Sequence, residues 1–260
     1  MAKLFLLAIL GLGLIIGYGR LTDGPASPAV SGPVIGAAQS RPAPAPVALA
    51  RSAGASGPRP DPGPRAPLIA QLARIEVRRR LALAGAAVYL DSLFIGPDSV
   101  IRRWGDDAVL QIWIGQPPDG APVARVVVEA IASWEGLRLG PSLRVTNDSA
   151  LANVLIGWVS DSASERTGLA QVESSQDGEI RLVKVSLART GVKGRAIGVD
   201  ETRSVALHEL GHALGLPHSG REGDIMYPTV SVSRLSDRDR SSAQLLYSIP
   251  PGALREPPSP

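Results

Sequence analysis

The sequence predicts a strand-rich α+β domain with one helix across the back of a sheet and another helix that carries a candidate site. Three observations support this fold class. Short apolar segments of strand length, rich in β-branched residues, recur between residues 109 and 187. Within this region, residues 122–135 instead place apolar side chains at helical intervals. Two further helical segments, 200–214 and 236–247, follow the last strand segment.

Two segments of different composition precede the domain. Residues 1–20 contain Lys3, an apolar run over 4–18 and Arg20, which is typical of a secretion signal or of a signal anchor. The run is slightly shorter than the roughly 20 residues of a spanning helix, and no clear cleavage site follows it, so both alternatives stay open. Either one predicts an extracytoplasmic protein, secreted or anchored in the membrane. Residues 21–66 are rich in Pro, Ala, Gly and Ser and are expected to form a disordered linker.

A helical segment is predicted between the linker and the domain, within residues 67–100. Its apolar residues Leu68, Leu72, Ile75 and Leu83 recur at near-helical spacing beside a basic face. A helix that packs on the domain is the simplest interpretation. A small propeptide and a helix on a membrane surface are the alternatives.

The domain itself is predicted to occupy residues 101–248, and residues 249–260 are expected to form a disordered tail. Polar or Gly-rich turns separate the strand segments, and no internal repeat divides the region. The expected strands, in chain order, are 109–114, 142–146, 154–159, 169–173 and 180–187.

The three helices of the domain each have a recognisable start. A Pro-Pro-Asp-Gly turn at 117–120 comes just before the first helix. Asp200 or Thr202 is the candidate N-cap of the second helix, which is expected to end near Leu214. Ser236 begins the last helical segment.

Composition excludes several classes of site. The chain has no cysteine, so disulfides, thiolate metal sites and cysteine nucleophiles are excluded. Its formal net charge of +3 comes from scattered arginines, and the longest basic run is residues 78–80, without interleaved aromatics. No nucleic-acid partner is therefore predicted. Only three histidines are present in the chain.

All three histidines fall in one short segment. On a helix, His208 and His212 lie about 40° apart around the axis, one turn above the other, so that both imidazoles can bind one ion. Glu209 points about 100° away from His208, where it can reach a metal-bound water as a general base. Gly215 can end the helix in a left-handed conformation, and the chain can then turn back with His218 as the third ligand. Three nitrogen ligands leave one tetrahedral position for water, which predicts a catalytic zinc.

The spacing His-Glu-x-x-His-x-x-Gly-x-x-His resembles the metzincin signature. The segment Asp-Ile-Met-Tyr-Pro, with Met226 at its centre, resembles the methionine turn that accompanies this signature. Ser219 after the third histidine and Pro228 after the turn resemble the matrixin branch of the metzincins. The closing segment is also similar to the last matrixin helix, because Asp239 matches its second aspartate, although Arg238 replaces the first.

The resemblance to matrixins implies a fold, an activity and a substrate site. The implied fold is a twisted mixed sheet of about five strands with a back helix, the zinc-binding active-site helix and a C-terminal helix. The implied activity is that of a zinc-dependent endopeptidase, with a protein or peptide substrate lying antiparallel to an edge strand. The implied substrate-binding residues are Leu169, Ala170, Val205, Pro228, Thr229 and Val230.

Two departures from the matrixin pattern stand out. The latency cysteine of the family is absent, and residues 160–167 contain no histidine for a structural zinc. One catalytic zinc ion per chain is therefore predicted. The acidic residues of this region match no recognisable calcium loop, and the sequence predicts neither a calcium requirement nor an oligomeric state.

Two alternative functions stay open at this point. One is a zinc hydrolase that acts on a non-peptide amide. The other is an inactive metzincin that serves as an anchored binding module. The presence of Glu209 argues against the second, since a protein without catalysis has no need of the base.

Overall fold

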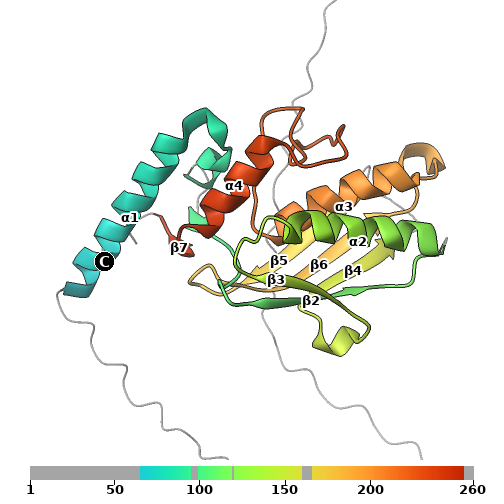
Figure 1. Cartoon of the computed structure of the whole chain (residues 1–260), viewed down its shortest axis with the longest axis horizontal. Coiled ribbons are helices and arrows are strands. Elements are labelled where there is room, and N and C mark those ends of the chain that lie inside the picture. The colour runs from blue at the N-terminus through green and yellow to red at the C-terminus, as the bar shows by residue number, and fades with distance from the viewer. Residues whose placement is uncertain (1–64, 95–98, 119, 160–165, 255–260) are drawn as a thin grey trace, which may run out of the picture. The chain divides into compact units, whose positions relative to one another are not determined.

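The computed structural model describes residues 65–94, 99–118, 120–159 and 166–254 (Figure 1). These residues belong to one compact unit, Pro64–Pro260. The predicted signal or anchor and nearly all of the predicted linker lie outside the described residues, as does the end of the predicted tail. Within the described residues, no helix is both long enough and apolar enough to cross a membrane.

A five-stranded mixed sheet organises the described residues, in the order β3-β2-β4-β6-β5. Neighbouring strands from β3 to β6 pair in parallel, and β5 pairs antiparallel with β6 at one edge. The predicted α+β fold with a mixed sheet is confirmed. The strands are β2 (Val109–Ile114), β3 (Ser142–Thr146), β4 (Val154–Val159), β5 (Gly168–Ser174) and β6 (Ile180–Ala188).

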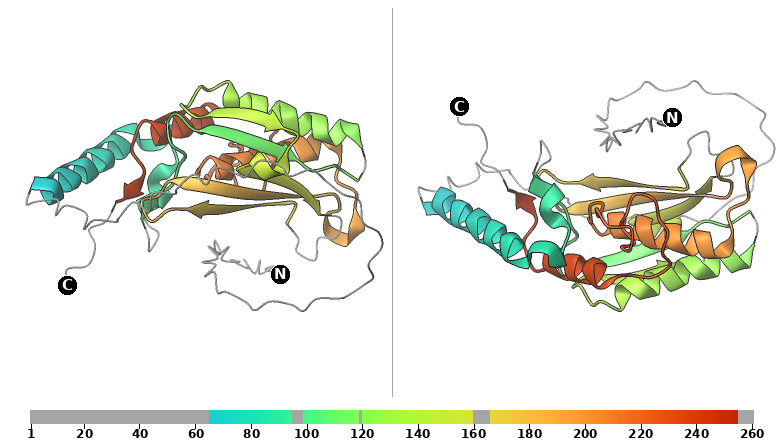
Figure 2. Two further views of the ribbon diagram at one scale, coloured as in Figure 1. Left: turned by 90° about the horizontal axis from the view of Figure 1, so that it is seen from below. Right: turned by 90° about the horizontal axis from the view of Figure 1, so that it is seen from above.

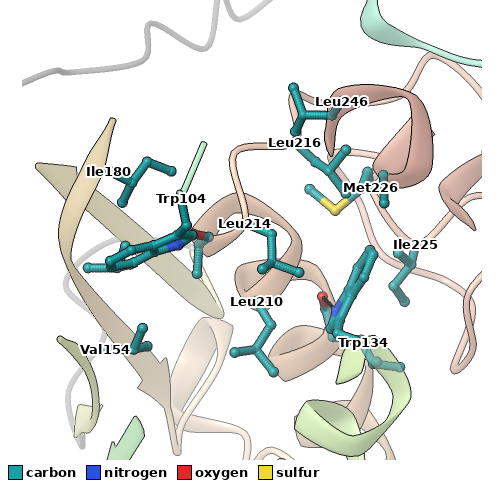
Figure 3. Packing of buried hydrophobic residues seen from close by; sticks show 14 of the residues in the cluster. Trp104, Trp134, Val154, Ile180, Leu210, Leu214, Leu216, Ile225, Met226 and Leu246 are labelled. Atoms are coloured by element: carbon teal, nitrogen blue, oxygen red, sulfur yellow. Dashed lines mark hydrogen bonds between the residues drawn. The ribbon is translucent and has the colours of Figure 1, made fainter. Parts of the chain in front are cut away.

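Two helices cover one face of this sheet, as the views in Figures 1 and 2 show. They are α2 (Ala121–Glu135) and α3 (Val199–Ala213). The Trp134 indole of α2 donates a hydrogen bond to the carbonyl of Leu207 in α3, at 3.0 Å. Trp104, just before β2, donates in the same way to the carbonyl of Ala213 at 2.8 Å. Each indole therefore fills the core while its polar N–H finds a partner, and Figure 3 shows both rings among the packed side chains around α3.

The start of α3 differs from the prediction. The N-cap is Gly198, without a side-chain cap, and neither Asp200 nor Thr202 occupies that position. The Thr202 hydroxyl instead donates to the Gly198 carbonyl at 2.8 Å from within the first turn. Asp200 and Glu201 also lie in the first turn, where negative charge is favourable to the helix dipole.

The helix before the domain is present as α1 (Arg65–Ala84), but it contacts the domain through a different face from the predicted one. The apolar residues that suggested a packing face are 53% to 72% exposed. Val77 and Leu81 enter the core instead. The basic face adds contacts, since Arg78 and Arg80 donate to the carbonyls of Leu254 and Ser248. Hydrogen bonds between these guanidinium groups and the two carbonyls thus orient the helix together with apolar burial. The exposed stripe consists of Leu68, Leu72, Ile75 and Leu83.

Short elements continue from α1 into the sheet. Two 3-10 turns follow it, η1 (Gly85–Ala87) and η2 (Leu90–Phe94). Strand β1 (Val100–Ile101) then pairs antiparallel with β7 (Gly252–Ala253) near the other end of the chain. Two further 3-10 turns are η3 (Ser149–Leu151) and η4 (Val192–Gly194).

The C-terminal helix α4 (Asp237–Tyr247) begins with a capping box. The Ser236 hydroxyl accepts from the backbone of Asp239, and the Asp239 carboxylate accepts from the backbone of Ser236. The chain stays ordered beyond this helix to residue 254, although a disordered tail was expected from residue 249. Ile249 and Leu254 are both buried, which explains why this short segment is fixed.

Candidate metal centre

The three histidines converge because α3 ends abruptly and the chain turns back. Gly215 has a φ of 96°, a left-handed conformation that favours glycine. A Cβ at this position would also lie 3.1 Å from the carbonyl carbon of Arg102 and closer still to its oxygen. After this turn, His218 approaches the helix, so that His212 Nε2 lies 3.1 Å from the Nε2 atoms of both His208 and His218. The predicted grouping of these residues is thus found in the structure, with one ligand atom from each within 4.8 Å of the others.

Backbone carbonyls orient two of the imidazoles. His208 Nδ1 lies 2.8 Å from the Ile225 carbonyl oxygen, and His212 Nδ1 lies 2.8 Å from the Leu216 carbonyl oxygen. Because a carbonyl can only accept, each Nδ1 carries the proton and each Nε2 lone pair faces the centre. Hydrogen bonds of this kind fix metal-binding histidines in one tautomer.

Burial keeps the histidines neutral in the absence of a metal ion. Burial, with repulsion from His208 and His218 when these are protonated, lowers the pKa of His212 from 6.5 to about 3. Burial, with repulsion from His208 when it is protonated, lowers the pKa of His218 to about 4. Burial also lowers the pKa of His208. Three neutral imidazoles with convergent lone pairs fit zinc, which binds nitrogen ligands in tetrahedral geometry.

Glu209 lies beside the histidines and against the edge strand β5. Burial raises the pKa of its carboxyl group to about 8, against the opposing effects of a hydrogen bond from the Ala170 backbone and of the Arg166 charge. A Cβ at Gly168 would lie 2.6 Å from Val205 Cγ1 and 2.7 Å from Glu209 Cγ, and closer still to the carboxylate oxygen. The strand therefore passes so close to Glu209 that any side chain at position 168 would force β5 or the neighbouring side chains to shift.

Met226 packs against α3, the helix that carries His208 and His212. Its side chain is fully buried, and a Cβ at Gly211 would meet its sulfur and lie 3.2 Å from its methyl carbon. The same position would be 3.2 Å from the Trp134 ring, so methionine and indole support the helix between His208 and His212 (Figure 3). The Met226 carbonyl accepts from the Ser219 backbone at 2.8 Å.

Asp239 supports the methionine segment from α4. Its carboxylate is completely buried, and Oδ2 accepts from the backbone N–H groups of Ile225 and Ser236, each at 2.8 Å. Since the Ile225 carbonyl also accepts from His208, one carboxylate is linked to a candidate metal ligand through a single residue.

Comparison with known proteins identifies this arrangement. The family model for Matrixin matches residues 147–248, which include the histidines, Glu209 and Met226. Residues 147–248 therefore form a matrixin-like domain.

Three curated relatives are similar to part of the chain. Metalloendoproteinase 2-MMP of Arabidopsis thaliana is 42% identical over 65 residues, which cover 23% of this chain and 17% of the relative. Macrophage metalloelastase of Rattus norvegicus is 51% identical over 51 residues, or 18% of this chain and 11% of the relative. Matrilysin of Felis catus is 40% identical over 63 residues, or 24% and 20%. The chain therefore spans only between 11% and 20% of the length of these relatives.

The residues expected to bind substrate lie on β5, on α3 and in the loop after Met226. Leu169 is exposed on the edge strand β5, and Ala170 beside it is half-buried and contacts Glu209. Val205 is buried in α3 against Gly168. The remaining three lie in the loop after Met226: Pro228 and Thr229 are exposed, and Val230 is half-buried.

Sequence reasoning missed two residues of the matrixin-like domain. Gly168 has no local signal, because its importance comes from the crossing of β5 and α3. Asp224 had a signal, since it begins the methionine segment, and it is buried with hydrogen bonds from Ser219 and Ser236. A buried carboxylate two residues before the turn methionine is a structural support of the loop that presents His218.

Proposed function

We propose that this protein is a zinc-dependent endopeptidase. The observation that carries the proposal is the convergence of three neutral imidazoles beside a buried glutamate and an open sheet edge. His208, His212 and His218 would hold the ion, which when bound would act as a Lewis acid and lower the pKa of a coordinated water. The names of the similar proteins, a metalloendoproteinase, a metalloelastase and a matrilysin, support the same activity.

Glu209 has the properties of a general base in this mechanism. Its burial favours the protonated carboxyl group, so the carboxylate readily accepts a proton from the attacking water. The same group then passes that proton to the leaving amine. The hydrogen bond from the Ala170 backbone holds the carboxylate next to the edge strand. Proton transfer would therefore take place beside the backbone that aligns the substrate.

The edge strand β5 is a suitable platform for an extended peptide. β6 occupies one side of β5, and the sheet order leaves the other side without a partner strand among the described residues. A peptide can add to such an edge through backbone hydrogen bonds. Leu169 and Ala170 would then contact the substrate, and Val205 with residues 228–230 would surround the side chain after the scissile bond.

Cleavage of a denatured protein such as casein tests the proposal. The full-length protein should cleave it, lose the activity with a chelator, regain it with added zinc and be inhibited by a hydroxamate. Tight zinc binding without any cleavage would favour the inactive binding module. Zinc-dependent hydrolysis of small amides alone would favour the non-peptide hydrolase.

We also propose that the catalytic domain works outside the cytoplasm, either secreted or anchored through residues 4–18. The composition of this apolar segment is the support for this proposal. Mass spectrometry of the mature amino terminus distinguishes the two forms. A start beyond Arg20 would indicate secretion, whereas an intact first segment would indicate anchoring.

A further inference from the structure

Residues 86–89 comprise the end of η1 and the two residues before η2, and they contact α4. Through α4 they are connected to the loop that presents His218, here called the metal-site loop. Arg238 of α4 donates from Nε to the Ala86 carbonyl and from Nη2 to the Val88 carbonyl, each at 3.0 Å. The Arg238 guanidinium also lies over the Tyr89 ring, with 5.4 Å from Cζ to the ring centroid. One side chain thus binds two backbone carbonyls and an aromatic face of the same short segment.

The third nitrogen of Arg238 points towards the metal site. Nη1 forms an ion pair with Asp224, and it lies 3.2 Å from the Ser219 hydroxyl. The Asp224 carboxylate also accepts hydrogen bonds from Ser219 and, at 2.7 Å, from Ser236. Because Ser219 directly follows His218, Arg238 connects residues 86–89 with the loop that presents the third ligand.

Tyr89 makes a second and separate connection. Its hydroxyl donates to Asp239 Oδ1 at 2.9 Å, while its backbone N–H donates to the Ser242 hydroxyl at 3.1 Å. Burial, with the charge of Asp239, raises the pKa of Tyr89, so the hydroxyl keeps the proton that it donates. The other oxygen of Asp239 holds the Ile225 backbone, whose carbonyl orients His208. The route therefore runs from Tyr89 through Asp239 and Ile225 to a metal ligand.

Both routes depend on buried carboxylates that need all of their donors. The side chain of Asp224 is 4% exposed, and Asp239 is completely buried. Removing a donor from a buried charge leaves it incompletely satisfied, so the loop around it has to rearrange. Changes in the outer shell of a metal site typically cost about 10-fold to 100-fold in metal affinity.

We propose that residues 86–89 form a permanent part of the metal site, with Arg238 and Tyr89 as positioning residues that fix His218 and His208. The proposal rests on the proposed zinc-dependent function. It extends the functional unit well before residues 147–248, the part that matches the matrixin model. It also implies that this segment stays attached to the active protein and is not discarded as a propeptide.

Zinc affinity and a cobalt spectrum of the full-length protein test the proposal. Arg238→Lys keeps a positive charge beside Asp224 but loses the fork that binds the Ala86 and Val88 carbonyls, and Tyr89→Phe removes only the hydroxyl. Each variant should bind zinc about tenfold or more weakly in competition with a chromophoric chelator. Each should also shift the visible absorption bands of the cobalt-substituted site. The matched control is Arg78→Gln, which loses a contact between α1 and the Leu254 carbonyl but none with the metal-site loop.

The outcomes separate a positioning role from a purely structural one. Lower stability to urea with unchanged zinc affinity and an unchanged cobalt spectrum in Arg238→Lys and Tyr89→Phe would overturn the proposal. If only Arg238→Lys keeps the parental zinc affinity and cobalt spectrum, Asp224 needs no more than a neighbouring positive charge. That result would overturn the Arg238 route. If the variants bind zinc as tightly as the parental protein, the positioning roles are overturned while the proposed function stays intact. Parental protein that binds no zinc would overturn both.

Discussion

Replacing Gly168 with alanine tests how closely the edge strand must approach the general base. The added methyl group would lie 2.6 Å from Val205 Cγ1 and 2.7 Å from Glu209 Cγ, well inside van der Waals contact. Either β5 therefore has to move by roughly 1 Å, or the Val205 and Glu209 side chains both have to shift. A misplacement of that size can cost about 100-fold in rate, which corresponds to roughly 2.7 kcal/mol in the activation barrier.

Gly157→Ala is the matched control for this substitution. Position 157 lies in strand β4 of the same sheet, and its Cβ would have the Val185 carbonyl oxygen as nearest neighbour at 4.0 Å. Initial rates on a quenched fluorescent peptide and the zinc content should be measured for both variants. Gly168→Ala should keep zinc and lose most of its kcat/KM, whereas Gly157→Ala should resemble the parent. Parental kcat/KM in Gly168→Ala would refute the argument that β5 and Glu209 must fit together.

The remaining predictions concern the candidate site. Glu209→Gln should keep zinc and lose about 100-fold to 10,000-fold in turnover, because the base is removed while the ligands stay, and near-parental turnover would contradict this role. His212→Ala should lose both zinc and activity. Elemental analysis of protein without a histidine tag should give one zinc per chain, because the three histidines of the chain are used at one site, and a second equivalent that survives gel filtration would contradict the count. Peptide-library profiling should show an apolar preference just after the scissile bond, since residues 228–230 and Val205 carry no charge, and a strong acidic or basic preference would remove the idea. The pKa of His212 falls from 6.5 to about 3 on folding, so between these values the unfolded chain binds more protons and stability falls as the pH is lowered. The test uses metal-free Glu209→Gln, because this variant lacks the titration of the glutamate, which has the opposite effect on stability. Acidification from about pH 7 to pH 5 should lower its free energy of unfolding, measured in urea. The loss should be smaller when His212 is also replaced by glutamine.

The sequence predicted those parts of the fold and site that depend on local spacing. The strands Val109–Ile114, Ser142–Thr146 and Val154–Val159 have the expected bounds, because β-branched apolar runs between turns are a local signal. The grouping of the histidines was predictable for the same reason, since a helical repeat and one glycine turn place them together.

Features that depend on contacts between distant segments could not be predicted in this way. The prediction of which face of α1 is buried was wrong. The carbonyls of Ser248 and Leu254 accept hydrogen bonds from arginines of this helix, and the spacing of its apolar residues contains no information about them. The need for a small residue at Gly168 arises only from the close approach of β5 to α3, which the local sequence does not show. The hydrogen bond between Tyr89 and Asp239 joins residues separated by 150 positions, and nothing local to either one signals it.

The double use of Asp239 restricts how this protein can change. One oxygen of its carboxylate caps the backbone of Ser236 at the start of α4 and also holds Ile225 next to the methionine turn. Glutamate is the more usual partner in a capping box, yet its extra methylene would carry the oxygen away from at least one of these two N–H groups. A substitution of Asp239 would therefore affect both the start of α4 and the shape of the candidate metal site. Redesign of α4 for greater thermal stability would have to keep this aspartate and work from the exposed positions of the helix.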